Sequence, residues 1–357
     1  MKKKLLALLA AGAMLLGLVG CSSTPATPSA TPAEGGDAAA TGETVKIGVS
    51  IYKFDDNFMT LYRNEIQNYV DELNKTSDVK YEVTIQDGKG DQAEQTNQID
   101  NFITQDFDVL IINLVQSTSA ATVIEKCKEA NKPCIFINRE PSAEDMTMYE
   151  NADGTAADPY ATMYTYVGAD ARQSGKFQGQ LIADLENKGD LNGDGVLQYV
   201  MVVGDPENVD AQYRTQFSIE EFQTASGLKV EKLDEQRGDW DQAKGQEIVA
   251  NALTKYGDKV EVVFCNNDGM ALGAAQAIAA ANRTVGKDIY LVGVDALAEA
   301  VELVSTGGMT GTVLNDHIGQ SHQAVDAAIK AVNGEKLDTY YWVDYVKVTP
   351  ANAAEFK

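Results

Sequence analysis

Short apolar runs alternate with longer segments of helical periodicity over most of the chain. The first pair is the apolar run 45–51 and the segment 58–73, where apolar residues recur at helical spacing. The same pattern predicts further strands at 81–85, 109–113, 134–138, 165–167, 197–203, 229–233, 260–265, 289–294, 311–314 and 341–348. It predicts further helices at 92–104, 118–129, 171–186, 211–225, 242–255, 270–281, 297–304 and 318–332. Such alternation is typical of doubly wound α/β units, in which right-handed crossovers make the sheets parallel.

One segment in the middle of the chain interrupts this alternation. Residues 141–161 are acidic, contain Gly154 and Pro159, and show no periodicity. We interpret them as a surface loop that leads out of a first α/β unit. The chain has 357 residues, more than one ordinary domain requires. Two similar units with a ligand cleft between them are therefore expected.

The N-terminus has the pattern of an export signal. Lys2, Lys3 and Lys4 precede the apolar run 5–19, and the junction Leu18-Val19-Gly20-Cys21 resembles the bacterial lipobox. That resemblance implies acylation of Cys21 and a lipid-anchored, extracytoplasmic protein; the alternative is an ordinary signal peptide with a chance cysteine. Residues 22–43 are rich in Ser, Thr, Pro, Ala and Gly, so they predict a flexible linker after a signal peptide at 1–21.

Charge and cysteine usage restrict the partners and the covalent structure. The 29 basic and 53 acidic residues give a formal charge of −24, which argues against nucleic acid and against an anionic membrane surface as partners. After Cys21 the chain has three cysteines, Cys127, Cys134 and Cys265, and an odd number does not describe a disulfide framework. Buried thiols are expected, with a Cys127–Cys134 bridge as the alternative.

The loop after the first strand carries the first candidate binding residues. Asp56 and Phe58 follow the run 45–51, and ligands of open α/β sheets bind at the carboxyl ends of strands. A sugar needs an aromatic face to stack on and strong acceptors for its hydroxyl groups. Other polar residues also follow predicted strands, namely Asn113, Asp210, Arg214, Asn267, Asp295 and Asn315. Each alone could be a helix cap, but their repetition at strand ends predicts a cleft lining.

Trp240 lies in a polar loop, where it could serve packing or form the second ring of a stacking pair with Phe58.

The sequence gives little support to an enzymatic function. The sequence has no Walker-type phosphate loop, no Gly-x-Ser-x-Gly and no His-Glu-x-x-His, and we interpret the two histidines, His317 and His322, as surface residues.

A calcium-binding loop is the most specific local motif. Asp190, Asn192 and Asp194 occupy positions 1, 3 and 5 of an EF-hand-like loop, and Gly195 occupies position 6. Val196 at position 7 would offer its carbonyl and Gln198 stands at position 9, but position 12 is Met201 instead of the usual Glu. The sequence therefore predicts a calcium site whose last ligand comes from elsewhere; the alternative is a plain polar turn.

Together, several of these segments resemble the galactose/glucose-binding proteins of the bacterial periplasmic sugar-binding family. The resemblance covers nearly all of the chain from Val45 onward, in motifs at 51–59, 112–115, 122–126, 190–198, 262–268, 293–297 and 311–316. It implies that Phe58 and Trp240 sandwich a pyranose ring. It also implies hydroxyl-binding roles for Asp56, Asn113, Asp210, Arg214, Asn267, Asp295 and Asn315. Glu261 matches the distant calcium ligand, and Asn208 stands where the family has a histidine, which affects fine sugar preference.

The resemblance further implies the type I periplasmic-binding-protein fold, two doubly wound Rossmann-like lobes joined by a three-segment hinge. We place the crossings near Arg139, Asn315 and Asp338. The expected N-terminal lobe is 44–139 plus 316–338, and the expected C-terminal lobe is 140–315 plus 339–357. The loop 141–161 is longer than the family's usual segment.

The implied function is capture of glucose or galactose by a monomer with a structural Ca²⁺, delivery to an ABC sugar permease and, in some bacteria, contact with a chemoreceptor. A binding protein for another small polyol, such as a pentose, is one alternative, and a sugar-acting enzyme is another. A sugar-responsive repressor core conflicts with the signal peptide and with the lack of a helix-turn-helix segment.

Overall fold

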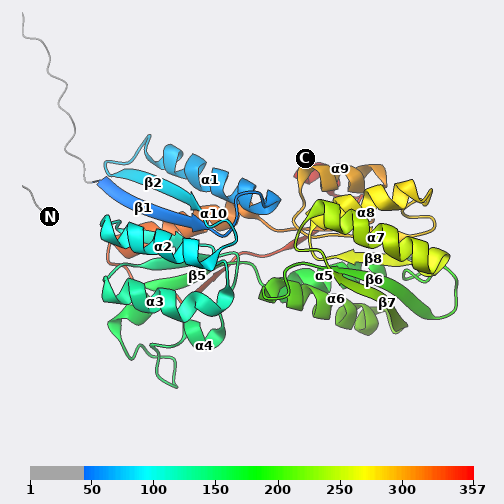
Figure 1. The fold of residues 1–357 in the computed structure, drawn as a ribbon, viewed down its shortest axis with the longest axis horizontal. Coiled ribbons are helices and arrows are strands. Elements are labelled where there is room, and N and C mark those ends of the chain that lie inside the picture. Colours follow the sequence, from blue (N-terminus) through cyan, green and yellow to red (C-terminus); the bar gives the residue numbers. More distant parts are fainter. Residues whose placement is uncertain (1–43) are drawn as a thin grey trace, which may run out of the picture. The chain divides into compact units, whose positions relative to one another are not determined.

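The computed structural model describes residues 44–357 (Figure 1). The predicted signal peptide 1–21 with its Cys21, and the whole predicted linker 22–43, lie outside the described residues. No helix in the described part is long and apolar enough to cross a membrane.

The first lobe is built on a six-stranded sheet. Its strand order is β11-β5-β4-β3-β1-β2, and all its pairings are parallel. The strands are β1 (Thr44–Ile51), β2 (Lys80–Asp87), β3 (Val109–Ile112), β4 (Cys134–Ile137), β5 (Tyr164–Gly168) and β11 (Tyr340–Trp342). The helices are α1 (Asn57–Leu73), α2 (Gln92–Thr104), α3 (Ala120–Glu129), the short α4 (Ala143–Met146) and α10 (His317–Val332).

Alternate residues of these strands enter two different cores. Ile111 packs with residues of α1 and α10 on one face of the sheet, and Leu110 and Ile112 pack with residues of α2 and α3 on the other. This follows from the two-residue period of a strand, which sends successive side chains to opposite faces. The strands are therefore buried on both faces, as parallel sheets usually are.

The second lobe repeats this arrangement around a four-stranded parallel sheet of order β7-β6-β8-β9. Its strands are β6 (Val196–Val203), β7 (Lys229–Arg237), β8 (Val262–Cys265) and β9 (Tyr290–Val292). Its helices are α5 (Ala171–Ala183), α6 (Val209–Ser226), α7 (Gln242–Tyr256), α8 (Asp268–Ala280) and α9 (Ala298–Thr306). A separate antiparallel pair is formed by β10 (Thr312–Leu314) and β12 (Val346–Val348).

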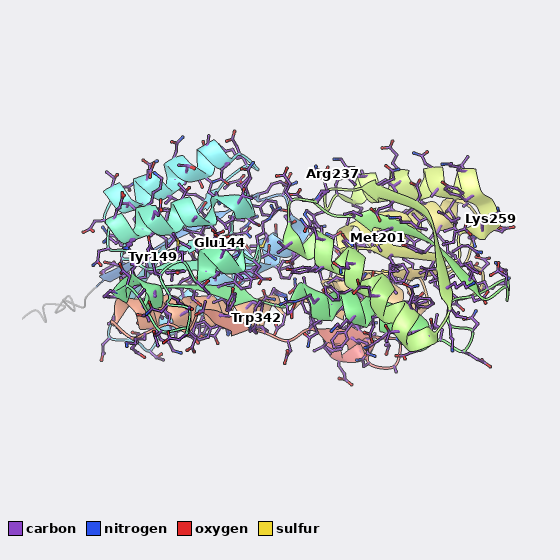
Figure 2. All side chains as sticks on the ribbon, turned by 90° about the horizontal axis from the view of Figure 1, so that it is seen from below. Glu144, Tyr149, Met201, Arg237, Lys259 and Trp342 are labelled. Atoms are coloured by element: carbon purple, nitrogen blue, oxygen red, sulfur yellow. The ribbon has the colours of Figure 1, made fainter. Side chains whose placement is uncertain are left out.

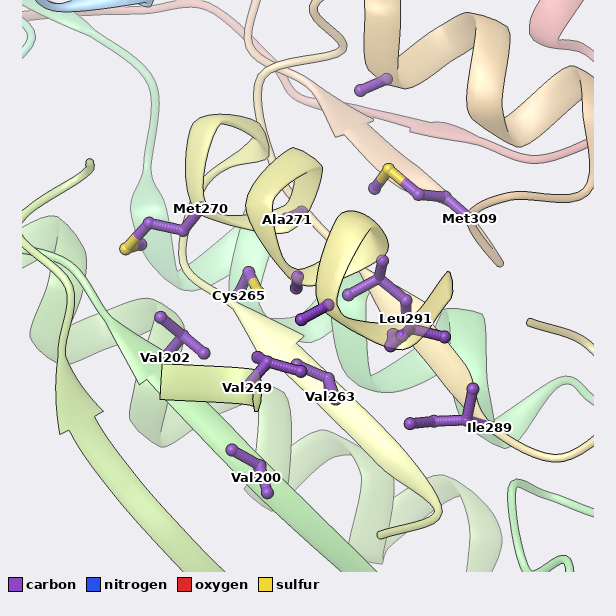
Figure 3. Close-up of a cluster of buried hydrophobic side chains, with 14 of the residues drawn as sticks. Val200, Val202, Val249, Val263, Cys265, Met270, Ala271, Ile289, Leu291 and Met309 are labelled. Carbon is purple, nitrogen blue, oxygen red and sulfur yellow. The ribbon is translucent and has the colours of Figure 1, made fainter. Parts of the chain in front are cut away.

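The cores of this lobe also lie on both sides of its sheet. Val200, Val202 and Val263 pack with α7 and α8 (Figure 3), whereas Met201 of β6, labelled in Figure 2, packs in the cluster on the other side. Helix α6 ends at Gly227, whose φ of 73° is the left-handed conformation that glycine adopts without a steric penalty.

The lobe boundaries differ from those expected. Because β5 pairs with β4 and β11 pairs with β5, residues 140–168 and 339–342 belong to the first lobe and not to the second. The segment 141–161 is not merely a surface loop, because Met146 and Tyr160 are buried in the core of the first lobe. The hydroxyl of Tyr164 in β5 donates to the Met146 carbonyl over 3.1 Å, which ties the segment to the sheet.

The chain crosses between the lobes after β5, between β10 and α10, and between β11 and β12. The crossing expected near Asn315 agrees with this, but the one expected near Arg139 does not, and the last lies beyond Trp342 rather than near Asp338. The predicted strand 341–348 is two strands, one in each lobe.

Cys127, Cys134 and Cys265 are buried free thiols, so the alternative of a Cys127–Cys134 bridge was wrong.

Candidate ligand-binding site

A cavity collects side chains from the strand ends of both lobes. It is lined by Tyr52, Asp56, Phe58, Asn138, Arg139, Asn208, Asp210, Arg214, Trp240, Asn267, Asp295 and Asn315. Every residue predicted to contact a sugar is in this set except Asn113. The space between the lining atoms, including its opening to solvent, is about 340 Å³.

Asp56 and Phe58 come from the start of α1. Asp56 caps this helix, with Oδ1 accepting from the Met59 amide over 2.8 Å, and its Oδ2 accepts from the Tyr52 hydroxyl over 2.6 Å. Phe58 packs edge-to-face on Tyr62 and His317, with ring centroids 6.0 and 6.4 Å apart. These contacts fix both the carboxylate and the ring before any ligand arrives.

Both histidines are half-buried, so the interpretation of them as plain surface residues was wrong. His317 supports Phe58. His322 stacks on Tyr69, with centroids 3.9 Å apart, and its Nε2 lies 2.8 Å from the Glu65 carboxylate. These contacts of His322 with Tyr69 and Glu65 join α10 to α1.

The start of α6 supplies three lining residues. Asn208 caps the helix, its Oδ1 accepting from the Asp210 amide over 3.0 Å, which leaves its amide group as a donor. Asp210 and Arg214 form a buried ion pair of 3.1 Å. Arg214 also donates to the Asn266 carbonyl and to the Tyr345 hydroxyl, over 3.0 and 2.9 Å. The guanidinium group is thus held rigidly in the wall.

The rest of the second-lobe wall comes from Trp240, Asn267, Asp295 and Asn315. Trp240 packs flat on the backbone at Gly204, where a Cβ atom would lie 2.2 Å from the indole ring. Asn267 caps α8 and donates to the Trp240 carbonyl over 3.4 Å. Asn315 donates to Asp295 over 3.3 Å. Burial raises the pKa of Asp295 well above its ordinary value.

Several lining residues have left-handed backbone conformations. The φ angles are 61° at Asn138, 66° at Trp240 and 122° at Asp295. Such conformations are costly for residues other than glycine, and they cluster where the surrounding structure holds side chains in place for function. Three of the ten non-glycine residues with positive φ among the described residues line this cavity.

Asn113 lies behind the cavity wall rather than in it. Its Oδ1 accepts from the Tyr52 amide over 3.2 Å, and its Nδ2 donates to the Ile137 carbonyl and to Asn138 Oδ1, over 3.1 and 3.2 Å. The amide is therefore largely used within the protein. Asn113 positions Tyr52 and Asn138, two residues that do line the cavity.

Sequence reasoning missed Tyr52, Asn138 and Arg139 as lining residues. Tyr52 lies in the same loop as Asp56, and Asn138 and Arg139 follow β4 directly. The rule that selected the other candidates, a polar residue just after a strand, would have found these two. Arg139 was instead interpreted as the point where the chain leaves the first lobe.

Two buried side-chain polar atoms of lining residues have no hydrogen-bond partner among the described residues. They are Oδ1 of Asp210, an acceptor, and Nε of Arg139, a donor. Burial raises the pKa of Asp210 above its ordinary value, although the charge of Arg214 opposes this. Buried polar groups are rarely left unpaired in proteins, so these two atoms are candidate partners for polar groups of a ligand.

The predicted calcium ligands also lie together, around the loop between α5 and β6 and the first residues of β6. Glu261, distant in sequence, reaches this loop, its Oε1 accepting from the Leu191 amide and its Oε2 from the Gln198 amide, over 2.7 and 2.9 Å. Asp190 accepts from the amides of Gly193 and Gly195. Within residues 44–357, no group of three or more His, Cys, Asp or Glu side chains is arranged to hold a metal ion. The oxygen atoms that could bind calcium are present, but they accept hydrogen bonds from backbone and side-chain amide groups.

Two parallel-sheet lobes, three crossing segments and a cavity built from the strand ends of both lobes define a two-lobed solute-binding protein. The chain belongs to the periplasmic binding protein domain family, whose sequence profile matches residues 47–336. The predicted fold class is confirmed.

Individual relatives agree with this assignment. The chain is 36% identical over 324 residues to the D-galactose/methyl-galactoside binding periplasmic protein of Haemophilus influenzae, covering 87% of this chain and 91% of that one. It is 26% identical to the ribose import binding protein of Bacillus subtilis, over 82% of this chain and 83% of the relative. A Bacillus halodurans ABC transporter solute binding protein, solved with bound myo-inositol, matches with a TM-score of 0.73 and 28% identity, covering 88% and 98% of the two chains.

Proposed function

We propose that the protein captures a hexose, glucose or galactose, in this cavity and delivers it to an ABC importer. The observation that carries the proposal is the composition of the wall. Two aromatic rings, Phe58 and Trp240, line one cavity with the carboxyl groups of Asp56, Asp210 and Asp295. A pyranose presents apolar faces to rings and hydroxyl groups to carboxylates, so its chemistry fits both parts of the wall.

The two unpaired atoms support a polyhydroxylated ligand in particular. A hydroxyl group both donates and accepts, so a sugar can give a hydrogen to Asp210 Oδ1 and accept one from Arg139 Nε. A purely apolar ligand would leave both atoms buried and unpaired, at a cost of about 1–3 kcal/mol each. The wall therefore favours sugars and polyols over apolar solutes.

The relatives support a hexose over the pentose alternative. The galactose-binding relative is more similar to this chain than the ribose-binding relative, at 36% against 26% identity. Calorimetry with glucose, galactose, ribose, xylose and myo-inositol tests this choice, and a pentose bound more tightly than either hexose would favour the alternative. Product analysis after prolonged incubation with the same sugars tests the enzyme alternative.

The proposal also includes a lipid anchor at the cell membrane and two protein partners. Acylation of Cys21 would hold the protein at the outer face of the cell membrane, with 22–43 as a tether that lets a monomer reach its permease. A chemoreceptor is a second proposed partner. The Bacillus halodurans relative is described as an ABC transporter component, which supports the permease.

We further propose a structural Ca²⁺ in the loop 190–198. Its ligands would be the side-chain oxygens of Asp190, Asn192, Asp194, Gln198 and Glu261 and the carbonyl of Val196. This all-oxygen set suits a hard cation, and Glu261 supplies a carboxylate in place of Met201. A bound ion would tie the α5–β6 loop to the strand region that carries Glu261.

EDTA is expected to lower the melting temperature of the wild type by several degrees, because an ion that binds only the folded state stabilises it by mass action. Asp194→Ala should melt at the same temperature with and without EDTA. Asp153→Ala is the matched control, because Asp153 also accepts from a backbone amide in an exposed loop, over 3.0 Å, but in the other lobe. Identical wild-type melting curves with and without EDTA would end the calcium proposal.

A further inference from the structure

Asp268 is a buried carboxylate that the proposed sugar site does not use. It is the first residue of α8, it is fully buried, and it is not one of the residues that line the cavity. Aspartate is rarely buried completely unless other groups pair with it. The groups that contact Asp268 therefore indicate what its carboxylate holds in place.

The two carboxylate oxygens of Asp268 join two other segments of the second lobe to α8. Oδ1 accepts from the Thr312 hydroxyl in β10 over 2.7 Å, and Oδ2 accepts from the Leu297 amide, just before α9, over 2.9 Å. The backbone amide of Asp268 donates to the Val294 carbonyl, after β9, over 2.7 Å. Burial raises the pKa of Asp268 to about 7, and the Thr312 hydroxyl and the amides of Leu297 and Ala296 oppose this shift.

Each of the three segments that meet at Asp268 supplies one residue of the cavity wall. Asn267 directly precedes Asp268, Asp295 lies two residues before Leu297, and Asn315 lies three residues after Thr312. One carboxylate thus joins the ends of three neighbouring strands. It can set the spacing of three lining side chains without facing the cavity itself.

The backbone beside Asp295 needs such a support. Asp295 and Ala296 have consecutive positive φ angles of 122° and 52°. Left-handed conformations are costly for residues other than glycine, and they persist only where the surrounding structure holds them. Asp268 binds the turn after Asp295 at the Leu297 amide. It also packs so closely on Gly293, before Asp295, that no Cβ atom would fit there.

We propose that Asp268 is a positioning residue that aims the Asp295 carboxyl group into the cavity and sets its spacing from Asn267 and Asn315. This inference rests on the proposed sugar-binding function. A polar group that is already ordered binds a hydroxyl group without a further cost in conformational entropy. Loss of Asp268 therefore weakens sugar binding although Asp268 touches no sugar atom.

The test is calorimetric titration of the wild type and two variants with glucose and galactose. Asp268→Ala removes both contacts and should raise the Kd about tenfold. Asp268→Asn should raise it about threefold or less, because its amide oxygen can accept from Leu297 and its amide nitrogen can donate to the Thr312 oxygen. Leu253→Ala is the stability control, since Leu253 lies in the core of the same lobe, in the last turn of α7. It should lower the melting temperature and keep the wild-type Kd.

A double-mutant cycle separates positioning from a general loss of stability. Asp295→Asn should raise the Kd about tenfold in the wild type but only about twofold in Asp268→Ala, where the Asp295 carboxyl group is already misplaced. Asp56→Ser changes the wall of the first lobe instead. Its loss should therefore add fully to that of Asp268→Ala.

A second pair of variants tests one contact alone and decides the question if Asp268→Ala does not fold. Thr312→Val removes the hydroxyl group that donates to Asp268 with little change of shape, and Thr312→Ser keeps it. Thr312→Val should raise the Kd about threefold, and Thr312→Ser should bind like the wild type.

Four results would overturn the proposal. They are a wild-type Kd in Asp268→Ala, an equal rise in Leu253→Ala, full additivity of Asp268→Ala with Asp295→Asn, and, where Asp268→Ala does not fold, a wild-type Kd in Thr312→Val. A wild type that binds neither glucose nor galactose would instead contradict the proposed function. That failure is visible in the first titration, before any variant is compared.

Discussion

Replacement of Asp210 by alanine is expected to lower the free energy of unfolding by about 3 kcal/mol, because it leaves a buried cation without its partner. Arg214 is 4% exposed and cannot recover the lost interaction from water. Its hydrogen bonds to Asn266 and Tyr345 remain, which places the loss at the lower end of the range for broken buried pairs, about 3–5 kcal/mol. Urea unfolding of the sugar-free protein measures this change directly.

The control for this prediction is Asp158→Asn, which breaks the half-exposed pair with Lys128 and should cost less than about 1 kcal/mol. If Asp210→Ala were as stable as this control, the Asp210–Arg214 pair would not be needed to hold the cavity wall. Sugar binding would then have to be explained without a rigid second-lobe wall.

Asp56→Ser is expected to weaken hexose binding about ten- to a hundredfold. A carboxylate that accepts from a hydroxyl group contributes about 1.5–3 kcal/mol, and tenfold in affinity corresponds to about 1.4 kcal/mol. Serine also caps helices, so it replaces the contact to the Met59 amide while removing the carboxylate from the cavity. Calorimetric titration with glucose and galactose measures the change.

Asp55→Ser is the matched control, because Asp55 is the neighbouring carboxylate, is largely exposed and pairs only with Lys53. It should bind sugar like the wild type. Asn208→Ser, which also keeps its helix cap, should lose tenfold or less, since a neutral hydrogen bond contributes only about 0.5–1.5 kcal/mol. A loss in Asn208→Ser as large as that in Asp56→Ser would show that the roles assigned to these two residues are wrong.

Much of the site was predictable because of one geometric rule. The carboxyl ends of parallel strands meet at the same edge of a sheet, so polar residues just after strands, such as Asp56, Asn267 and Asp295, gather without any further information. Asn113 satisfies the same rule but lies behind the wall. Which way a side chain points from a strand end depends on neighbouring strands. Asn113 points away from the cavity because it is hydrogen-bonded to the Tyr52 amide and to a backbone carbonyl of β4 beside it.

The lobe boundaries could not be predicted because strand pairing is a long-range choice. The run 165–167 looks like any buried strand, and only its pairing with β4 assigns it to the first lobe. The segment 341–348, predicted as one strand, falls in β11 and β12, which pair with β5 and β10 in different lobes. Asp344 lies between the two strands, but a single charged residue also fits the alternation of one half-buried strand. Arg139 follows β4 and so satisfies the strand-end rule, but it was missed because it was interpreted as the point where the chain leaves the first lobe.

The most direct test of the central claim is a calorimetric titration of the purified full chain with D-glucose and D-galactose. We expect saturable binding of one sugar per chain for at least one of them, with a Kd in the micromolar range or below. This binding should be lost in a variant that combines Asp56→Ser with Trp240→Ala. If the folded protein gives no heat of binding with either sugar at millimolar concentration, or if the double variant binds as tightly as the wild type, the cavity is not a hexose site.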